Sequence, residues 1–157
     1  MTTTIFLHGL DSSGRGAKGS FLTGNFPEVL CPDFFGTLRE RLNQLAVLCT
    51  GRAELNLIGS SFGGLMATCY AISNRKSVKQ LTLLAPALNF AEYTPPAQML
   101  NIPTLLVIGR HDTVTPPELV LPMAEKTFSD LEVLVVDDDH MLHNTFRTLP
   151  WRERYME

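Results

Sequence analysis

The sequence contains few of the residues that form disulfide bonds or bind metal ions. Among its 157 residues are only three cysteines, an odd number without CxxC spacing: Cys31, Cys49 and Cys69. Because each lies in an apolar setting, we expect reduced thiols that pack inside the protein. No group of cysteines and histidines has the spacing of zinc ligands, and the aspartates at residues 137–139 are typical of a solvated loop. The sequence therefore predicts neither a metal nor a cofactor.

Long apolar runs and clustered basic residues are also missing. No stretch reaches the roughly 20 uninterrupted apolar residues that span a bilayer. The first residues carry no basic charge, and residues 5–7 are too short for the apolar core of a signal peptide. The formal net charge is −3, and the 13 lysines and arginines are scattered, without a stripe for phosphates. We therefore expect a cytoplasmic protein whose partners include neither nucleic acid nor membrane.

Length and composition are those of one ordinary globular domain. Apolar residues make up 45% of the chain and charged residues 18%, and a chain of 157 residues buries a core without staples. There is no internal repeat, low-complexity tract or linker, so we expect a single domain spanning residues 1–157. Residues 85–103 hold four of the ten prolines and predict a long loop, with one helical turn near residues 98–101.

Short apolar runs alternate with stretches of helical periodicity along the whole chain. We expect six strands, at residues 3–7, 29–31, 55–58, 81–84, 104–108 and 132–136. We expect helices at residues 38–49, 61–74, 117–128 and 141–149, followed by a frayed charged tail at residues 151–157. This alternation predicts an α/β fold, a three-layer sandwich whose mainly parallel sheet of about six strands carries helices on both faces.

The strongest functional signal is a G-x-S-x-G motif at residues 59–63, Gly-Ser-Ser-Phe-Gly. It follows the predicted strand at residues 55–58 and precedes a predicted helix, which is the context of a nucleophile elbow. The turn crowds the backbone around the nucleophile, and glycines two residues before and after it relieve that crowding. We therefore predict that Ser61 is a nucleophile at the carboxyl edge of the sheet. The alternative is a strand-to-helix turn that only needs glycine.

A serine hydroxyl needs a base that takes its proton, and the base needs a carboxylate that orients it. In this type of site the chain order is serine, acid, histidine. Asp112 follows the predicted strand at residues 104–108, and His140 follows the one at residues 132–136. Both loops should open on the sheet edge that carries Ser61, because all three follow parallel strands. We therefore predict a catalytic triad of Ser61, Asp112 and His140.

Alternatives to two of these assignments stay open. Asp112 is also suited to a turn or a helix cap before Pro116, and His140 to an exposed position at a helix start. His143 lies three residues after His140 and is the main competitor as the base. His111 is adjacent to the predicted acid, so its side chain would have to point elsewhere.

An acyl-transfer site also needs two backbone N–H donors for the oxyanion. We expect one from Phe62, directly after the nucleophile, and one from Leu10, where Gly9 allows close approach of the backbone. His8 precedes the serine in the chain, which does not fit the expected order and favours a structural role beside the site. By loop position, the substrate pocket is predicted to include four apolar residues: Leu10, Phe62, Leu88 and Met141.

These motifs resemble those of the α/β-hydrolase superfamily: HGL after the first strand, GSSFGG, GRHDTVTP and DDDH. The opening IFLHGLDSSGRGAKGSFL, with GSSFGGLMA, is more particular and is similar to the small, lid-less bacterial esterases of the YqiA type. The superfamily resemblance covers nearly the whole chain and implies triad positions for Ser61, Asp112 and His140. It also implies a fold without the first two strands of larger hydrolases, and without a lid at residues 85–103.

The resemblance and the motifs together predict a serine hydrolase that cleaves a carboxylic ester or thioester through an acyl-enzyme on Ser61. The same triad serves peptidases, acyltransferases and carbon–carbon hydrolases, because this fold hosts them all. A non-catalytic ligand-binding protein of the same fold is a third possibility, which the complete triad disfavours. The apolar pocket predicts a small-molecule substrate with an apolar acyl or alcohol group, and the oligomeric state stays open.

Overall fold

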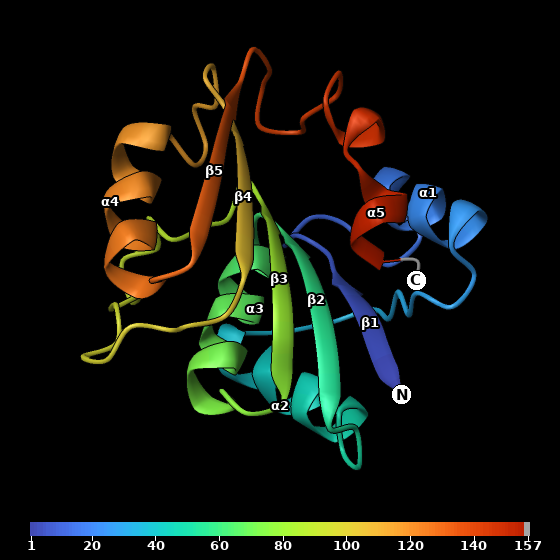
Figure 1. Ribbon diagram of the computed structural model, residues 1–157. Coiled ribbons are helices and arrows are strands. Elements are labelled where there is room, and N and C mark those ends of the chain that lie inside the picture. The colour runs from blue at the N-terminus through green and yellow to red at the C-terminus, as the bar shows by residue number, and fades with distance from the viewer. Residues whose placement is uncertain (156–157) are drawn as a thin grey trace.

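The computed structural model describes residues 1–155 and contains a parallel sheet with helices on both faces (Figure 1). The sheet has five strands, and their order across the sheet is the same as their order along the chain. They are β1 (Thr2–Leu7), β2 (Glu54–Ser60), β3 (Val78–Leu84), β4 (Thr104–Gly109) and β5 (Leu131–Val136). Because every neighbouring pair is parallel, the carboxyl ends of all these strands lie at one edge of the sheet.

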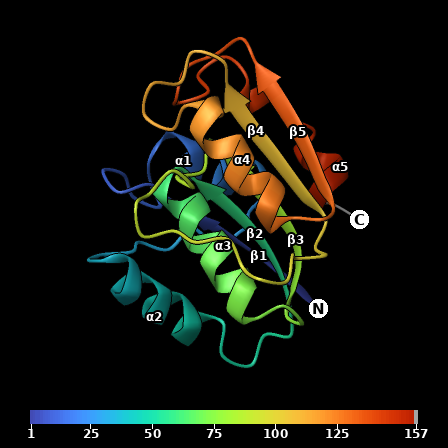
Figure 2. The same ribbon diagram turned by 90° about the vertical axis from the view of Figure 1, so that its left-hand side faces the viewer.

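The helices form one layer on each side of the sheet (Figure 2). One side carries α2 (Leu38–Leu48), α3 (Phe62–Ser73) and α4 (Pro117–Thr127), and the other carries α1 (Ala17–Asn25) and α5 (Trp151–Tyr155). The predicted three-layer α/β sandwich is therefore confirmed. Among residues 1–155, no helix has both the length and the apolar character needed to cross a bilayer.

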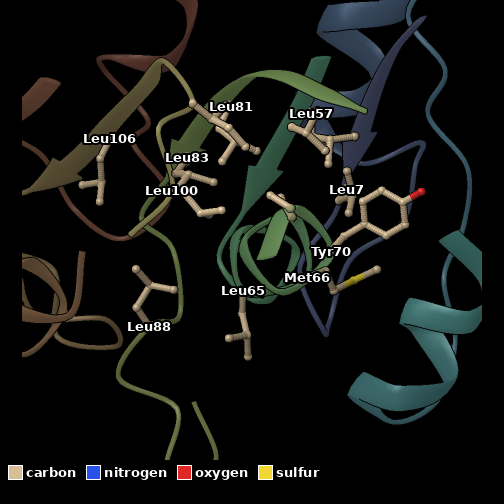
Figure 3. Close-up of a cluster of buried hydrophobic side chains, with 14 of the residues drawn as sticks. Leu7, Leu57, Leu65, Met66, Tyr70, Leu81, Leu83, Leu88, Leu100 and Leu106 are labelled. Carbon is tan, nitrogen blue, oxygen red and sulfur yellow. The ribbon is translucent and has the colours of Figure 1, made fainter. Parts of the chain in front are cut away.

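Successive side chains of each strand alternate between the two faces, and this alternation produces two cores. The larger core lies under α3 and is built on buried leucines of the strands, drawn in Figure 3: Leu7, Leu57, Leu81, Leu83 and Leu106. The smaller core lies under α1 and α5 and includes Phe6, Ile58, Leu84 and Val107. Strand β4 is buried along its whole length, whereas β5, at the edge of the sheet, is only half-buried. Coverage of both faces explains why the inner strands are continuous apolar runs.

Helices α2, α3 and α4 begin and end within a residue or two of the bounds predicted from the sequence. Local sequence signals explain this agreement. Helix α2 begins with a capping box. The Glu40 N–H donates to the Thr37 hydroxyl oxygen, and the Thr37 N–H donates to the Glu40 carboxylate. Helix α4 begins directly after Pro116, with Pro117 in its first turn. Prolines and capping boxes act within a few residues, so they are readable without tertiary information.

The apolar run at residues 29–31 forms a single bridge, and the expectation of a strand there is wrong. The Leu30 N–H donates to the Thr4 carbonyl oxygen over 2.9 Å, and the Leu30 carbonyl accepts from the Phe6 N–H over 2.8 Å. The residue whose N–H would make the next ladder bond is Pro32, which has no N–H. Pairing therefore stops after one residue, and the sheet has five strands.

The expected helix at residues 141–149 is also wrong. Only Phe146–Thr148 forms a short 3₁₀ turn, because the Asp138 carboxylate accepts the N–H groups of Asn144 and Thr145 over 3.0 and 2.9 Å. These hydrogen bonds fold residues 139–145 into a loop around the buried Asp138 carboxylate. Within this loop Leu142 has a left-handed backbone conformation, with φ of 54°. The sequence pattern is helical, but the side chain of one buried aspartate overrides it.

The charged tail that was expected to fray is folded as α5. Trp151 is buried, and its indole N–H donates to the Phe146 carbonyl oxygen over 2.8 Å. Residues 156–157 of that expected tail lie outside the described residues. Trp151 packs in the smaller core, and the Arg154 side chain also donates to the Thr82 hydroxyl over 3.2 Å, so α5 is held to the sheet by packing and by hydrogen bonds.

Two further segments differ from expectation, and two neighbouring phenylalanines lie in different environments. Residues 17–25 form α1, which the glycines Gly19 and Gly24 made unreadable as a helix. Residues 98–101 form no helical turn, because Leu100 makes a bridge with Phe128 at the end of α4. Of the pair Phe34-Phe35, Phe34 lies in the larger core and Phe35 is exposed.

We expect Trp151→Ala to lower the free energy of unfolding by about 3–5 kcal/mol, because it removes a buried aromatic side chain and leaves a cavity. Urea denaturation followed by circular dichroism measures the change. Val47→Ala, at an exposed site on α2, is the matched control and should have little effect. A loss below about 1 kcal/mol in Trp151→Ala would show that Trp151 does not anchor α5 to the core.

The three thiols should be slow to alkylate in the folded protein. All are unpaired, and burial raises the pKa of Cys31, of Cys49 and of Cys69, the last to about 11. Since the thiolate is the reactive form, a raised pKa leaves little of it at pH 8. Iodoacetamide at pH 8, followed by mass spectrometry, should label all three rapidly in urea and slowly without it. Rapid labelling of any one thiol in the native protein contradicts the assignment as packing residues.

Candidate active site

Ser61 occupies a sharp turn between β2 and α3, at the carboxyl edge of the sheet. Its backbone has φ 56° and ψ −116°, a conformation that L-residues rarely adopt, and its N–H donates to the Leu84 carbonyl oxygen over 2.9 Å. A Cβ on Gly63 would overlap the Leu7 carbonyl oxygen of β1, so only glycine allows α3 to start this close to the sheet. The tight strand–turn–helix geometry expected from the motif is present.

The side chains of Ser61, His140 and Asp112, which come from three different loops, form one hydrogen-bonded line. Its Oγ lies 3.0 Å from Nε2 of His140, and Nδ1 of His140 lies 2.7 Å from Oδ2 of Asp112. The Asp112 side chain is fully buried, and 17% of the His140 side chain is exposed. The contact to the carboxylate places the imidazole proton on Nδ1, which leaves Nε2 to accept the serine proton. The predicted convergence of Ser61, Asp112 and His140 is therefore observed.

The Asp112 carboxylate is held by its own loop as well as by the histidine. Its Oδ1 accepts the N–H groups of Val114 and Thr115 over 2.8 and 2.7 Å, and its Oδ2 accepts the Thr115 hydroxyl over 2.7 Å. The Thr115 hydroxyl oxygen also lies 3.1 Å from Nδ1 of His140. Asp112 therefore shapes its turn and contacts His140 at the same time, because Oδ1 accepts only N–H groups of the loop and Oδ2 bonds both Thr115 and His140. Thr115 was not singled out from the sequence, where it is an ordinary threonine before a proline.

The loop that carries His140 is shaped by Asp138. This buried carboxylate accepts from the N–H groups of Asn144 and Thr145, from the Thr145 hydroxyl over 2.8 Å and from the Asp139 N–H over 2.8 Å. A fully bonded buried carboxylate makes the loop rigid without a helix. The sequence predicts a solvated run for all three aspartates at residues 137–139, since nothing in three consecutive aspartates marks the buried one.

The competing histidines have other partners. His143 contacts Asp139, with 2.7 Å between Nδ1 and Oδ2, and His111 contacts Asp137, with 2.7 Å between Nε2 and Oδ1. Both imidazoles are exposed. Hydrogen bonding from His143 lowers the pKa of Asp139, and hydrogen bonding from His111 lowers the pKa of Asp137. The geometry therefore favours His140 over His143 as the base.

His8 is buried beside the site and has two backbone partners. Its Nε2 accepts the Phe34 N–H over 2.8 Å, so the proton lies on Nδ1, 2.6 Å from the Gly9 carbonyl oxygen. Both ring nitrogens are therefore occupied in holding the loop after β1. This arrangement supports the structural role expected for His8.

Two backbone donors are available near Ser61. The N–H groups of Leu10 and Phe62 have no hydrogen-bond partner in the described part of the chain. Phe62 is the first residue of α3, so its N–H belongs to the positive end of that helix. Both residues line the cavity beside Ser61. The prediction that these two N–H groups form an oxyanion hole stays a prediction.

A cavity of about 590 Å³ opens beside Ser61 and His140. Three of the four expected wall residues line it: Leu10, Phe62 and Met141. Leu88 does not, because it is fully buried in the larger core (Figure 3), and Ala87 and Asn89 line the cavity on either side of it. The cavity has further apolar walls that sequence position did not indicate: Phe6, Phe90, Ala91 and Val114.

Lys18 of α1 is a cation in the cavity wall. Its ammonium group donates to the Met141 carbonyl oxygen over 2.8 Å, which links α1 to the loop that carries His140. Burial lowers the pKa of Lys18, and the nearby carboxylates of Asp139 and Asp138 oppose that shift.

Across residues 1–155, no group of three or more potential metal ligands is arranged to hold an ion.

Comparison with known proteins agrees with this architecture. A model of the alpha/beta hydrolase fold family matches residues 11–97, which is more than half of the chain. The protein therefore belongs to the alpha/beta hydrolase fold family. No curated protein matches its sequence. The narrower resemblance to YqiA-type esterases stays a prediction.

Several solved structures share the fold at low identity. Est1E of Butyrivibrio proteoclasticus with bound ferulic acid has a TM-score of 0.74 and 16% identity, over 92% of this chain and 83% of that one. The esterase Pf2001 of Pyrococcus furiosus has a TM-score of 0.73 and 21% identity, over 98% and 79%. Mouse alpha/beta hydrolase domain-containing protein 10 has a TM-score of 0.74 and 16% identity, over 93% and 85%. At these identities the likeness shows the fold alone.

We expect Asp138→Asn to lower the free energy of unfolding by about 2–3 kcal/mol, because the amide turns an acceptor into a donor among N–H groups. Urea denaturation measures the loss. The adjacent Asp137→Asn, which changes an exposed carboxylate, is the matched control and should leave the unfolding midpoint almost unchanged. Equal effects of the two substitutions would show that Asp138 does not shape the loop.

Proposed function

We propose that the protein is a serine hydrolase that cleaves a carboxylic ester or thioester through an acyl-enzyme on Ser61. The observation that carries the proposal is the unbroken hydrogen-bonded line from Ser61 Oγ through His140 to the buried Asp112, beside a cavity. A nucleophile, a base and an orienting acid in this geometry are the elements of acyl transfer. Family membership and the esterase Pf2001 among proteins of the same fold add support.

In the first half-reaction, Ser61 Oγ attacks the carbonyl carbon while Nε2 of His140 takes the hydroxyl proton. The carbonyl oxygen becomes an oxyanion, which the Leu10 and Phe62 N–H groups stabilise. The carbon–oxygen or carbon–sulfur bond then breaks as His140 gives the proton to the leaving alcohol or thiol. Asp112 holds the imidazole tautomer and stabilises the imidazolium that forms transiently.

In the second half-reaction, water replaces the alcohol or thiol. His140 takes a proton from water, the hydroxide attacks the acyl carbon, and the proton returns to Ser61 Oγ as the acid leaves. All steps use groups of the chain and one water, so the proposal requires no metal or cofactor. The apolar walls formed by residues such as Leu10, Phe62 and Met141 favour a small-molecule substrate with an apolar acyl or alcohol group.

Two kinds of alternative function use the same residues: a different reaction of the acyl-enzyme or triad, and ligand binding without catalysis. An acyltransferase would give the acyl-enzyme to an acceptor other than water, and a peptidase or carbon–carbon hydrolase would use the triad on another bond. A non-catalytic member of the fold would bind a ligand in the cavity without turnover. The strained backbone of Ser61, at φ 56°, favours catalysis, because a binding role does not need that strain.

A panel of p-nitrophenyl esters of increasing chain length tests the proposal. We expect wild-type hydrolysis and a loss of about 10⁴-fold or more in kcat in Ser61→Ala, because the nucleophile is removed. His140→Ala should lose activity comparably, whereas His143→Ala, at an exposed imidazole three residues away, is the matched control and should retain it.

The outcomes separate the hypotheses. A full loss in His143→Ala with activity retained in His140→Ala would transfer the base to His143. A fluorophosphonate probe that leaves well-folded wild type unlabelled at Ser61 would overturn the serine-hydrolase proposal. Ligand binding that is unchanged in Ser61→Ala, without turnover of any ester, would favour the binding protein.

A further inference from the structure

Arg41 of α2 is a buried cation without a carboxylate partner. Only 5% of its surface is exposed, although arginine is almost never buried unless it is paired. Its Nε donates to the Gly36 carbonyl oxygen over 3.0 Å. Its Nη1 is buried and has no hydrogen-bond partner among residues 1–155. The guanidinium keeps its proton at any ordinary pH, so a positive charge is held inside the protein.

The guanidinium lies against the residue that carries an oxyanion donor. Its central carbon is 5.4 Å from the centroid of the Phe62 ring, within the range of a cation–π contact. The Phe62 ring also makes a T-shaped contact with the Phe90 ring, with 5.8 Å between their centroids. Both rings line the cavity. Arg41 itself does not line the cavity. It therefore lies behind the wall formed by Phe62.

The nearest opposite charge that acts on Arg41 is on the loop after β1. Burial lowers the pKa of Arg41, and the carboxylate of Asp11, next to Leu10, opposes that shift. Asp11 is exposed and lines the cavity. The described residues contain no ion pair between Arg41 and Asp11, so the buried charge is only partly balanced. The buried charge of Arg41 therefore lies on the Phe62 side of the two donors.

We propose that Arg41 is a positioning residue of the oxyanion hole, whose buried charge acts through Phe62 to stabilise the negative oxygen formed during acyl transfer. The inference rests on the proposed serine-hydrolase function. A neutral ester does not benefit from this charge, but the tetrahedral intermediate does, because its oxygen is an anion in a site of low dielectric constant. The effect should therefore fall on kcat and leave KM nearly unchanged.

A purely structural role predicts different behaviour. An unpaired buried guanidinium is costly, and an apolar side chain of similar length often replaces a buried charge without loss of stability. Packing against Phe62 depends on shape, whereas the proposed role depends on charge. Substitutions that keep or remove the charge therefore distinguish the two roles.

The experiment compares Arg41→Lys, which keeps the charge, with Arg41→Gln, which removes it. The readout is the phosphonylation of Ser61 by a fluorophosphonate, in which the oxygen–phosphorus bond forms and fluoride leaves. We expect the maximal labelling rate to fall about tenfold or more in Arg41→Gln and to stay within about threefold of wild type in Arg41→Lys. The probe concentration that gives half-maximal rate should not change in either variant. Arg39→Gln, at an exposed arginine of the same helix, is the matched control and should label like wild type.

Each outcome bears on one claim. Equal rates in Arg41→Gln and wild type overturn the inference, as do equally slow rates in Arg41→Gln and Arg41→Lys, which would point to packing. Circular dichroism checks the fold, and Arg41→Met replaces Arg41→Gln, with the same expected loss, if the glutamine variant does not fold. Wild type that is folded but unlabelled would instead overturn the proposed function, and this inference with it.

Discussion

The first turn of α3 passes so close to the end of β1 that no side chain fits between them. A Cβ on Gly63 would overlap the Leu7 carbonyl oxygen, and the turn before it forces Ser61 to φ 56°. This contact determines where the Ser61 hydroxyl and the Phe62 N–H lie relative to the loop after β1, which contributes the Leu10 N–H. The strain at one residue is stabilised by the surrounding core, as expected for a strained position that persists in a folded protein.

The position of His140 depends on a second and different kind of constraint. His140 lies on a loop built around the buried carboxylate of Asp138, and a Cβ on Gly109 would overlap the carbonyl oxygens of Asp138 and Asp139. Strand β4 and this loop therefore touch through their backbones. Asp112 lies three residues after β4, so the same contact helps to bring its carboxylate within 2.7 Å of the His140 imidazole. The serine is placed by a tight turn, whereas the histidine is placed by hydrogen bonds.

Few charges surround the cavity, and each has a defined environment. Asp112 is bonded on both oxygens, and the Lys18 ammonium donates to the Met141 carbonyl oxygen. Arg41 is the exception, since one of its nitrogens is buried and unbonded next to Phe62. The one buried side-chain nitrogen without a partner among residues 1–155 therefore lies next to Phe62, which lines the cavity beside Ser61. Under the proposed function, such an arrangement favours the charge of a transition state over optimal stability of the folded protein.

The sequence by itself determined the parallel α/β architecture, the elbow at Ser61 and the loops that carry Asp112 and His140. Apolar runs, glycine spacing and chain order act over short distances, and a parallel sheet brings the carboxyl ends of its strands to one edge. Only the tertiary structure distinguished His140 from the nearby His143, placed Leu88 in the core and buried Arg41. It also replaced a predicted helix by the loop around Asp138. Those outcomes depend on which groups are removed from water by distant parts of the chain, and no local pattern records that burial.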